Sequence, residues 1–126
     1  MKTTFLALTL TLPTAAAATQ TGTFIALWDA ASRARAVDGK TAAQTLATPE
    51  LKALLDEFAS VAGAYRQQIL DARAAGKTPR ACPPKSLDLT VDAVVADVRA
   101  LPPAWQTRDF AESFGAALDK RYPCGG

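Results

Sequence analysis

Two cysteines, Cys82 and Cys124, limit how this chain can fold more than any other feature of its 126 residues. Cys82 opens a Cys82-Pro83-Pro84 turn, and Cys124 lies two residues from the chain end. In an oxidising compartment such a pair favours a disulfide over a redox or metal site. Closing the long loop between them should contribute about 4 kcal/mol to stability. It should also hold the two intervening helical segments together as an antiparallel hairpin.

The N-terminus predicts export to that compartment. Lys2 is followed by the short apolar run Phe5–Leu12 and the small residues Ala15–Ala18, the layout of a secretory signal peptide cleaved at the end of the alanine run. The run is shorter than the roughly 20 apolar residues that span a bilayer; the alternative is a hydrophobic helix kept in the fold. We therefore expect a signal peptide over residues 1–18 and a single helical domain over 19–126, located in the periplasm.

The pattern of apolar residues after the signal is helical throughout, with spacings of three and four residues and no hairpin signal. Asp38–Ala47 has no clear apolar face and is expected to be a loop or a weak helical turn. The sequence thus predicts an all-α bundle of four or five helices. The expected helices run from Thr23 to about Val37, from Pro49 to a stop at Gly76, from Val91 to Leu101, and through Phe110, Phe114, Leu118 and Tyr122.

Capping residues mark where these helices should begin. Thr48 before Pro49 is a strong N-cap signal, Asp88 or Thr90 can cap the third helix, and Thr107 is expected to cap the fourth after the Pro102-Pro103 break. Gly63 lies inside the second helix. It indicates either close packing against a neighbour or a break in the helix.

Composition argues against catalysis, metal binding and nucleic-acid binding. There is no histidine, and the formal net charge is only +2, without a clustered basic patch. The carboxylate pairs, such as Asp88 with Asp92 and Asp109 with Glu112, stand at expected helix starts, where acids interact favourably with the helix dipole. We expect no catalytic residue, no cofactor and no metal site.

Two segments have the composition of recognition surfaces. The first is Trp105 with Gln106 and Arg108 after the proline break, which favours an interface hot spot or, alternatively, a lid over the core. The second is the basic, proline-rich loop Lys77–Lys85, in which we single out Arg80, Pro83 and Lys85. A disulfide and prolines would stiffen this loop for an acidic partner, although it can equally be an ordinary solvated connection.

From Ala62 onward the chain resembles the Tai/Rap family of periplasmic immunity proteins, which neutralise peptidoglycan amidase effectors of type VI secretion. The matching features, in order, are Ala62–Tyr65 on a helix, the Cys82-Pro83-Pro84 turn, the valine-rich helix Val91–Leu101, a proline break, and the aromatic-Pro-Cys ending Tyr122-Pro123-Cys124. The chain departs from many members of this family in lacking a second cysteine pair.

The resemblance implies inhibition by occlusion: an exported helical protein, often a homodimer, covers the active-site cleft of a cognate amidase with a loop. We place the occluding surface on the Lys77–Lys85 loop or on the Trp105–Arg108 segment. A small periplasmic chaperone of the acid-stress type, also helical with one disulfide, is the main alternative. An enzyme using Asp or Glu with a cofactor is a weaker one.

Overall fold

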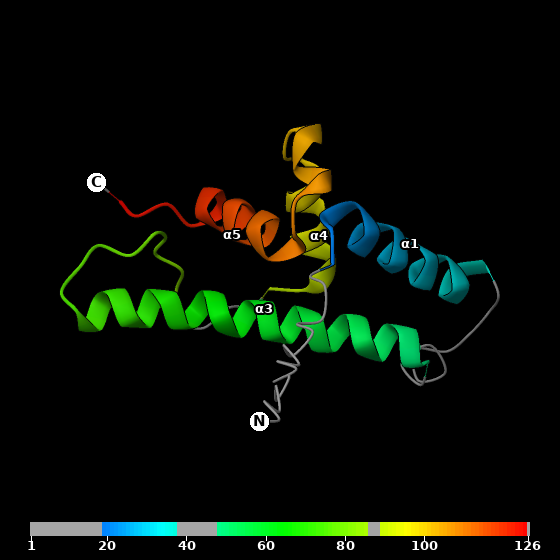
Figure 1. Cartoon of the computed structure of the whole chain (residues 1–126), viewed down its shortest axis with the longest axis horizontal. Coiled ribbons are helices and arrows are strands. Elements are labelled where there is room, and N and C mark those ends of the chain that lie inside the picture. The colour runs from blue at the N-terminus through cyan, green and yellow to red at the C-terminus, as the bar shows by residue number, and fades with distance from the viewer. Residues whose placement is uncertain (1–18, 38–47, 86–88, 126) are drawn as a thin grey trace, which may run out of the picture.

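The computed structural model describes residues 19–37, 48–85 and 89–125 (Figure 1). The expected signal peptide, the segment Asp38–Ala47 and the candidate cap Asp88 lie outside these residues. The described part is all-α, as predicted, and none of its helices is long and apolar enough to cross a membrane. Its elements are α1 (Thr21–Val37), α3 (Pro49–Ala74), α4 (Val91–Arg99), the 3₁₀-helix η1 (Pro103–Thr107) and α5 (Phe110–Arg121).

Helix α3 is the longest element and runs along the whole length of the fold (Figure 1). Its start is as predicted: the Thr48 side chain accepts a hydrogen bond from the Leu51 amide at 3.4 Å, with Pro49 in the first turn. Gly76 follows its end with a φ of 69°, the left-handed conformation that stops helices and that glycine adopts without strain.

Helix α4 is capped by Thr90, whose hydroxyl accepts from the Ala93 amide at 3.1 Å. The predicted cap of α5 is wrong. Thr107 ends η1 instead, where its hydroxyl donates to the Ala104 carbonyl at 3.2 Å, and Asp109 is the N-cap of α5. The physical reason is that Pro103 fixes a helical φ directly after the break, so a short 3₁₀-helix forms first and delays α5.

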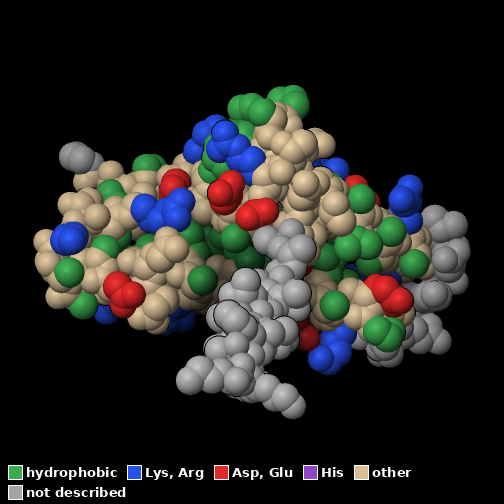
Figure 2. All heavy atoms as spheres, in the orientation of Figure 1, with side chains coloured by type: hydrophobic (Ala, Val, Ile, Leu, Met, Phe, Trp, Pro, Cys, Tyr) green, Lys and Arg blue, Asp and Glu red, His purple; other side chains and the backbone are tan. Residues whose placement is uncertain are grey.

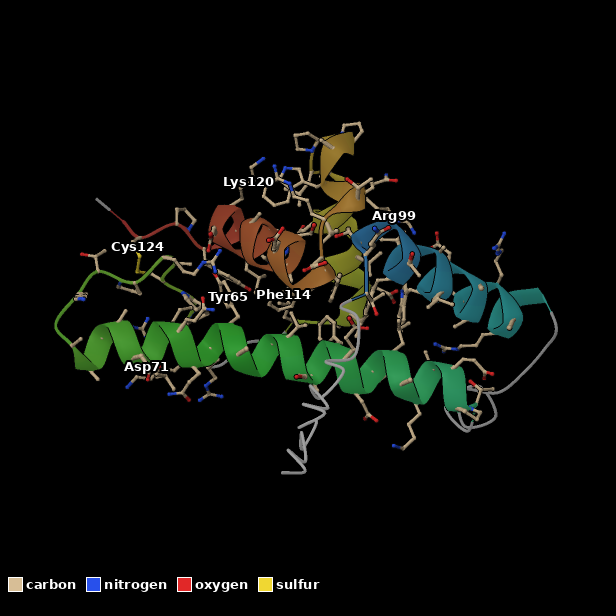
Figure 3. All side chains as sticks on the ribbon, viewed as in Figure 1. Tyr65, Asp71, Arg99, Phe114, Lys120 and Cys124 are labelled. Atoms are coloured by element: carbon tan, nitrogen blue, oxygen red, sulfur yellow. A yellow bond between two sulfur atoms is a disulfide. The ribbon has the colours of Figure 1, made fainter. Side chains whose placement is uncertain are left out.

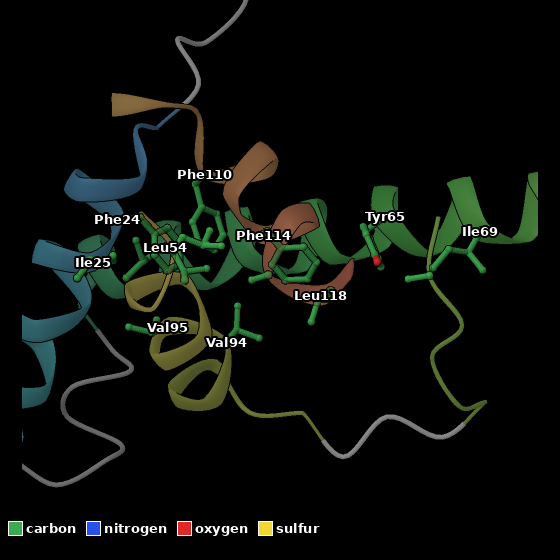
Figure 4. Close-up of a cluster of buried hydrophobic side chains, with 14 of the residues drawn as sticks. Phe24, Ile25, Leu54, Tyr65, Ile69, Val94, Val95, Phe110, Phe114 and Leu118 are labelled. Atoms are coloured by element: carbon green, nitrogen blue, oxygen red, sulfur yellow. The ribbon is translucent and has the colours of Figure 1, made fainter. Parts of the chain in front are cut away.

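The core lies between α1, α4 and α5 and one face of α3 (Figure 4). Phe110 stacks on Phe24 with ring centroids 3.7 Å apart, and Phe114 meets Phe58 and Tyr65 edge-on, each at 5.7 Å. The stripes predicted from helical spacing supply these side chains. Burial of this apolar surface is the main force holding the helices together.

The predicted disulfide joins Cys82, in the loop before α4, to Cys124, after α5. The Cys82 amide also donates to the Tyr122 carbonyl at 2.8 Å, so a backbone hydrogen bond joins the two segments in addition to the disulfide. Helices α4 and α5 pack against each other as a hairpin with η1 between them. In Figure 1 they cross rather than run strictly antiparallel.

Both interpretations of Gly63 are wrong, because α3 is continuous through it and a Cβ at this exposed position would meet nothing within 4 Å. Gly63→Ala should therefore raise the free energy of unfolding by about 1 kcal/mol, since alanine loses less backbone entropy in a helix. Urea denaturation measures the change. Gly76→Ala is the matched control and should lower the free energy of unfolding by about 1 kcal/mol, because alanine is strained at the positive φ of this position. A loss of stability in Gly63→Ala would contradict the placement of Gly63 at an exposed position inside a continuous helix.

Candidate functional site

The segment Pro102–Arg108, which we call the tip, projects from the bundle above α4 and α5 (Figure 1). Most of its side chains are exposed, including both prolines, Gln106 and Arg108. In Figure 2 hydrophobic side chains lie at the top of the view, where the tip is in Figure 1, with basic side chains beside them. The tip is therefore a convex, partly apolar and partly cationic surface.

A buried pair of hydroxyls fixes the tip to the bundle. The Thr21 side chain donates to the Arg108 carbonyl at 2.9 Å and lies 2.6 Å from the Ser113 hydroxyl. Ser113 also reaches the Trp105 carbonyl at 3.3 Å. Thr21 and Ser113 are 1% and 0% exposed, so these bonds are shielded from water. Side chains from α1 and α5 thus hold the tip at its middle, Trp105, and at its C-terminal end, Arg108, which leaves it little conformational freedom to lose on binding.

Ser113→Ala should lower the free energy of unfolding by about 1–3 kcal/mol, because it leaves the buried Thr21 hydroxyl and Trp105 carbonyl with fewer partners. Thermal unfolding followed by circular dichroism measures the loss. Ser60→Ala, at an exposed position of α3, is the control and should change stability by less than about 0.5 kcal/mol. Equal effects of the two substitutions would show that the hydroxyl pair does not anchor the tip.

Within the tip, Trp105 is half-buried and packs against the core, which agrees with the interpretation of this residue as a lid. The Arg108 guanidinium covers the outer side of the indole, 4.0 Å from the ring centroid. Gln106 lies beside the first turn of α1. Its backbone carbonyl oxygen is so close that a Cβ added at Gly22 would lie 3.3 Å from it. Of the residues predicted here, Gln106 and Arg108 present their side chains to solvent.

Arg80 is the first candidate residue of the Lys77–Lys85 loop, and its side chain binds other residues of the fold. Its guanidinium makes a two-point contact with the Asp119 carboxylate of α5, with both Nε and Nη2 at 2.9 Å from its oxygens. Nη1 donates to Gln68 at 3.0 Å. Gly115 makes this arrangement possible, since a Cβ there would lie 2.7 Å from the guanidinium. Arg80 therefore positions the loop against α3 and α5.

Tyr65 completes this cluster from α3, donating its hydroxyl to Asp119 at 2.8 Å (Figure 3). Burial raises the pKa of the Tyr65 phenol above its ordinary value, and the hydrogen bond to the Asp119 carboxylate raises it further. The same carboxylate raises the pKa of Arg80. Tyr65 consequently remains a protonated donor and Arg80 a cation at any physiological pH, so the cluster is a fixed structural clamp rather than an acid–base pair.

Pro83 and Lys85 border a cavity of about 540 Å³ between α3, α5 and the loop, which we call the α3–α5 groove. Several residues of its apolar floor are labelled in Figure 4. The residues that line it are Phe58, Ala62, Tyr65, Arg66, Ile69, Leu70, Arg73, Pro83, Pro84, Lys85, Leu89, Phe114 and Leu118.

The two predicted segments do not form one site. The tip is bound to Ser113 near the start of α5, whereas Arg80 is bound to Asp119 near its end. Sequence reasoning missed Thr21 and Ser113 as anchors and Arg66 and Arg73 as groove residues. Across residues 19–37, 48–85 and 89–125, no three acidic or cysteine side chains gather closely enough to hold a metal ion.

Comparison with known proteins adds no assignment: no family model matches the chain, and neither a curated protein nor a solved structure is significantly similar to it.

Proposed function

We propose that this chain is a periplasmic immunity protein that binds a peptidoglycan amidase effector of type VI secretion and covers its active-site cleft. The ordered resemblance to the Tai/Rap family supplies the class of partner. The anchored tip, Pro102–Arg108, is the single observation that supports the mode of action best, because an enzyme cleft is blocked by a convex element that enters it.

The tip has the physical properties that such an inhibitor needs. Its backbone is held by Thr21 and Ser113, and its two prolines restrict it further, so binding orders little additional chain. Its exposed surface combines apolar prolines with Gln106 and Arg108, and arginine is enriched among residues that dominate interface energies. Inhibition of this kind requires recognition only, and no step of it depends on a reactive group in the chain.

The double variant Gln106→Ala/Arg108→Glu should weaken inhibition of the cognate amidase by at least about thirtyfold, since an interface hot spot contributes about 2 kcal/mol or more. The two side chains are exposed, so the fold should be retained. Inhibition constants are measured with the cognate peptidoglycan amidase.

Arg33→Glu, at an exposed cation of α1 away from the tip, is the matched control and should inhibit like the wild type. The same inhibition constant for all three proteins would remove the tip from the proposal. A folded protein that inhibits no amidase but prevents client aggregation when acidified would favour the chaperone alternative instead.

A further inference from the structure

The α3–α5 groove combines an apolar floor with a cationic rim. Its floor is formed by aromatic and aliphatic side chains, among them Leu70, which is 43% exposed although it is a large hydrophobic residue. Arg66 and Arg73 of α3 stand on the rim, and Lys85 of the disulfide-bonded loop also lines the groove. No acidic residue is among the side chains that line it. A concave apolar surface with a few charged groups at its edge is the usual form of a binding site.

The rim cations differ from the other arginines around the core. Arg80, Arg99 and Arg121 each pair with an aspartate of another segment. The side chains of Arg66, Arg73 and Lys85, in contrast, form no ion pair or hydrogen bond with any other described residue. Their positive potential over an apolar floor is therefore uncompensated within the part of the chain that the structure describes, and it would attract an anionic ligand.

The spacing of these cations selects the kind of ligand. Arg66 and Arg73 are two helical turns apart, which places them about 10 Å from each other along α3. A fatty acid carries one carboxylate, so it would leave two of the three rim cations uncompensated. A helix with two acids separated by two turns matches that spacing, and its apolar face would cover the floor at the same time.

We propose that the α3–α5 groove docks an acidic amphipathic helix of a protein partner, with its apolar face on the floor and its carboxylates against Arg66, Arg73 and Lys85. The inference rests on the proposed function in that the partner is a protein. It adds a second contact surface, separate from the tip, and states the chemistry of the partner segment that occupies it.

Two fluorescent helical peptides about four turns long test the groove. Both carry leucine on one face; one has glutamates two turns apart and the other has lysines at the same places. The glutamate peptide should bind the wild-type protein about tenfold more tightly than the lysine peptide, because exposed ion pairs each contribute a factor of a few. The variant Arg66→Glu/Arg73→Glu should reverse this preference. Arg33→Glu/Arg35→Glu, with the same charge change on α1, should retain it.

Equal binding of the two peptides, or an unchanged preference in Arg66→Glu/Arg73→Glu, would overturn the proposal. So would laurate binding to the groove while neither peptide binds, since that result makes the ligand a single-headed amphiphile. Amidase inhibition by the wild-type protein is measured in parallel. If the wild-type protein prefers the glutamate peptide but does not inhibit the amidase, the amidase assignment alone is refuted. If it inhibits the amidase but binds both peptides equally, the groove proposal alone is refuted.

Discussion

Replacing both Cys82 and Cys124 with serine should lower the free energy of unfolding by about 4 kcal/mol, because the disulfide closes a loop of 42 positions and restricts the unfolded chain accordingly. This is a large share of the roughly 5–15 kcal/mol that stabilises a typical domain. Guanidinium denaturation of the wild-type and double-serine proteins measures the difference.

Reduction of the wild-type protein with a thiol reagent is the matched control and should produce the same loss without any substitution. If the double-serine variant and the reduced protein both unfold within about 1 kcal/mol of the oxidised wild type, the crosslink does not stabilise the fold as described. Alkylation of both thiols in the wild-type protein without prior reduction would contradict the disulfide itself.

Phe110→Ala should lower the free energy of unfolding by about 3–5 kcal/mol, the range for removing a buried phenylalanine ring. Phe110 is 1% exposed, stacks on Phe24 and meets Phe114 with ring centroids 6.0 Å apart, so the cavity would open between α1, α3 and α5. Thermal unfolding by calorimetry measures the loss.

Leu70→Ala is the control for this prediction, because Leu70 is large and apolar but 43% exposed. It should change stability far less than Phe110→Ala, since much of its side chain is already in contact with water. A comparable loss in the two variants would show that the aromatic cluster is not the centre of the core.

Helices and core could be predicted from the sequence because the determining signals are local. The stripe on α3 repeats at helical spacing, and Thr48 with Pro49 marks its start within a few residues. The start of α5 was missed because a second local signal competed: Pro103 initiates η1, and Thr107 completes that turn rather than capping the next helix. Composition alone does not decide between two capping sites so close together.

The candidate site was harder to predict because its contacts are distant in sequence. Arg80 resembled a free surface cation, yet it pairs with Asp119, 39 positions away, across a gap that only glycine at position 115 leaves open. The hydroxyl pair that anchors the tip joins residues 92 positions apart. Such contacts depend on how the helices pack, which no periodic pattern encodes.

Titration of the cognate amidase with the wild-type protein tests the proposed function, which is the central claim, most directly. Hydrolysis of peptidoglycan fragments should fall steadily and stop once the inhibitor is present in stoichiometric amount, while the inhibitor itself releases no product. Undiminished hydrolysis at a large excess of folded, disulfide-bonded protein would contradict the account.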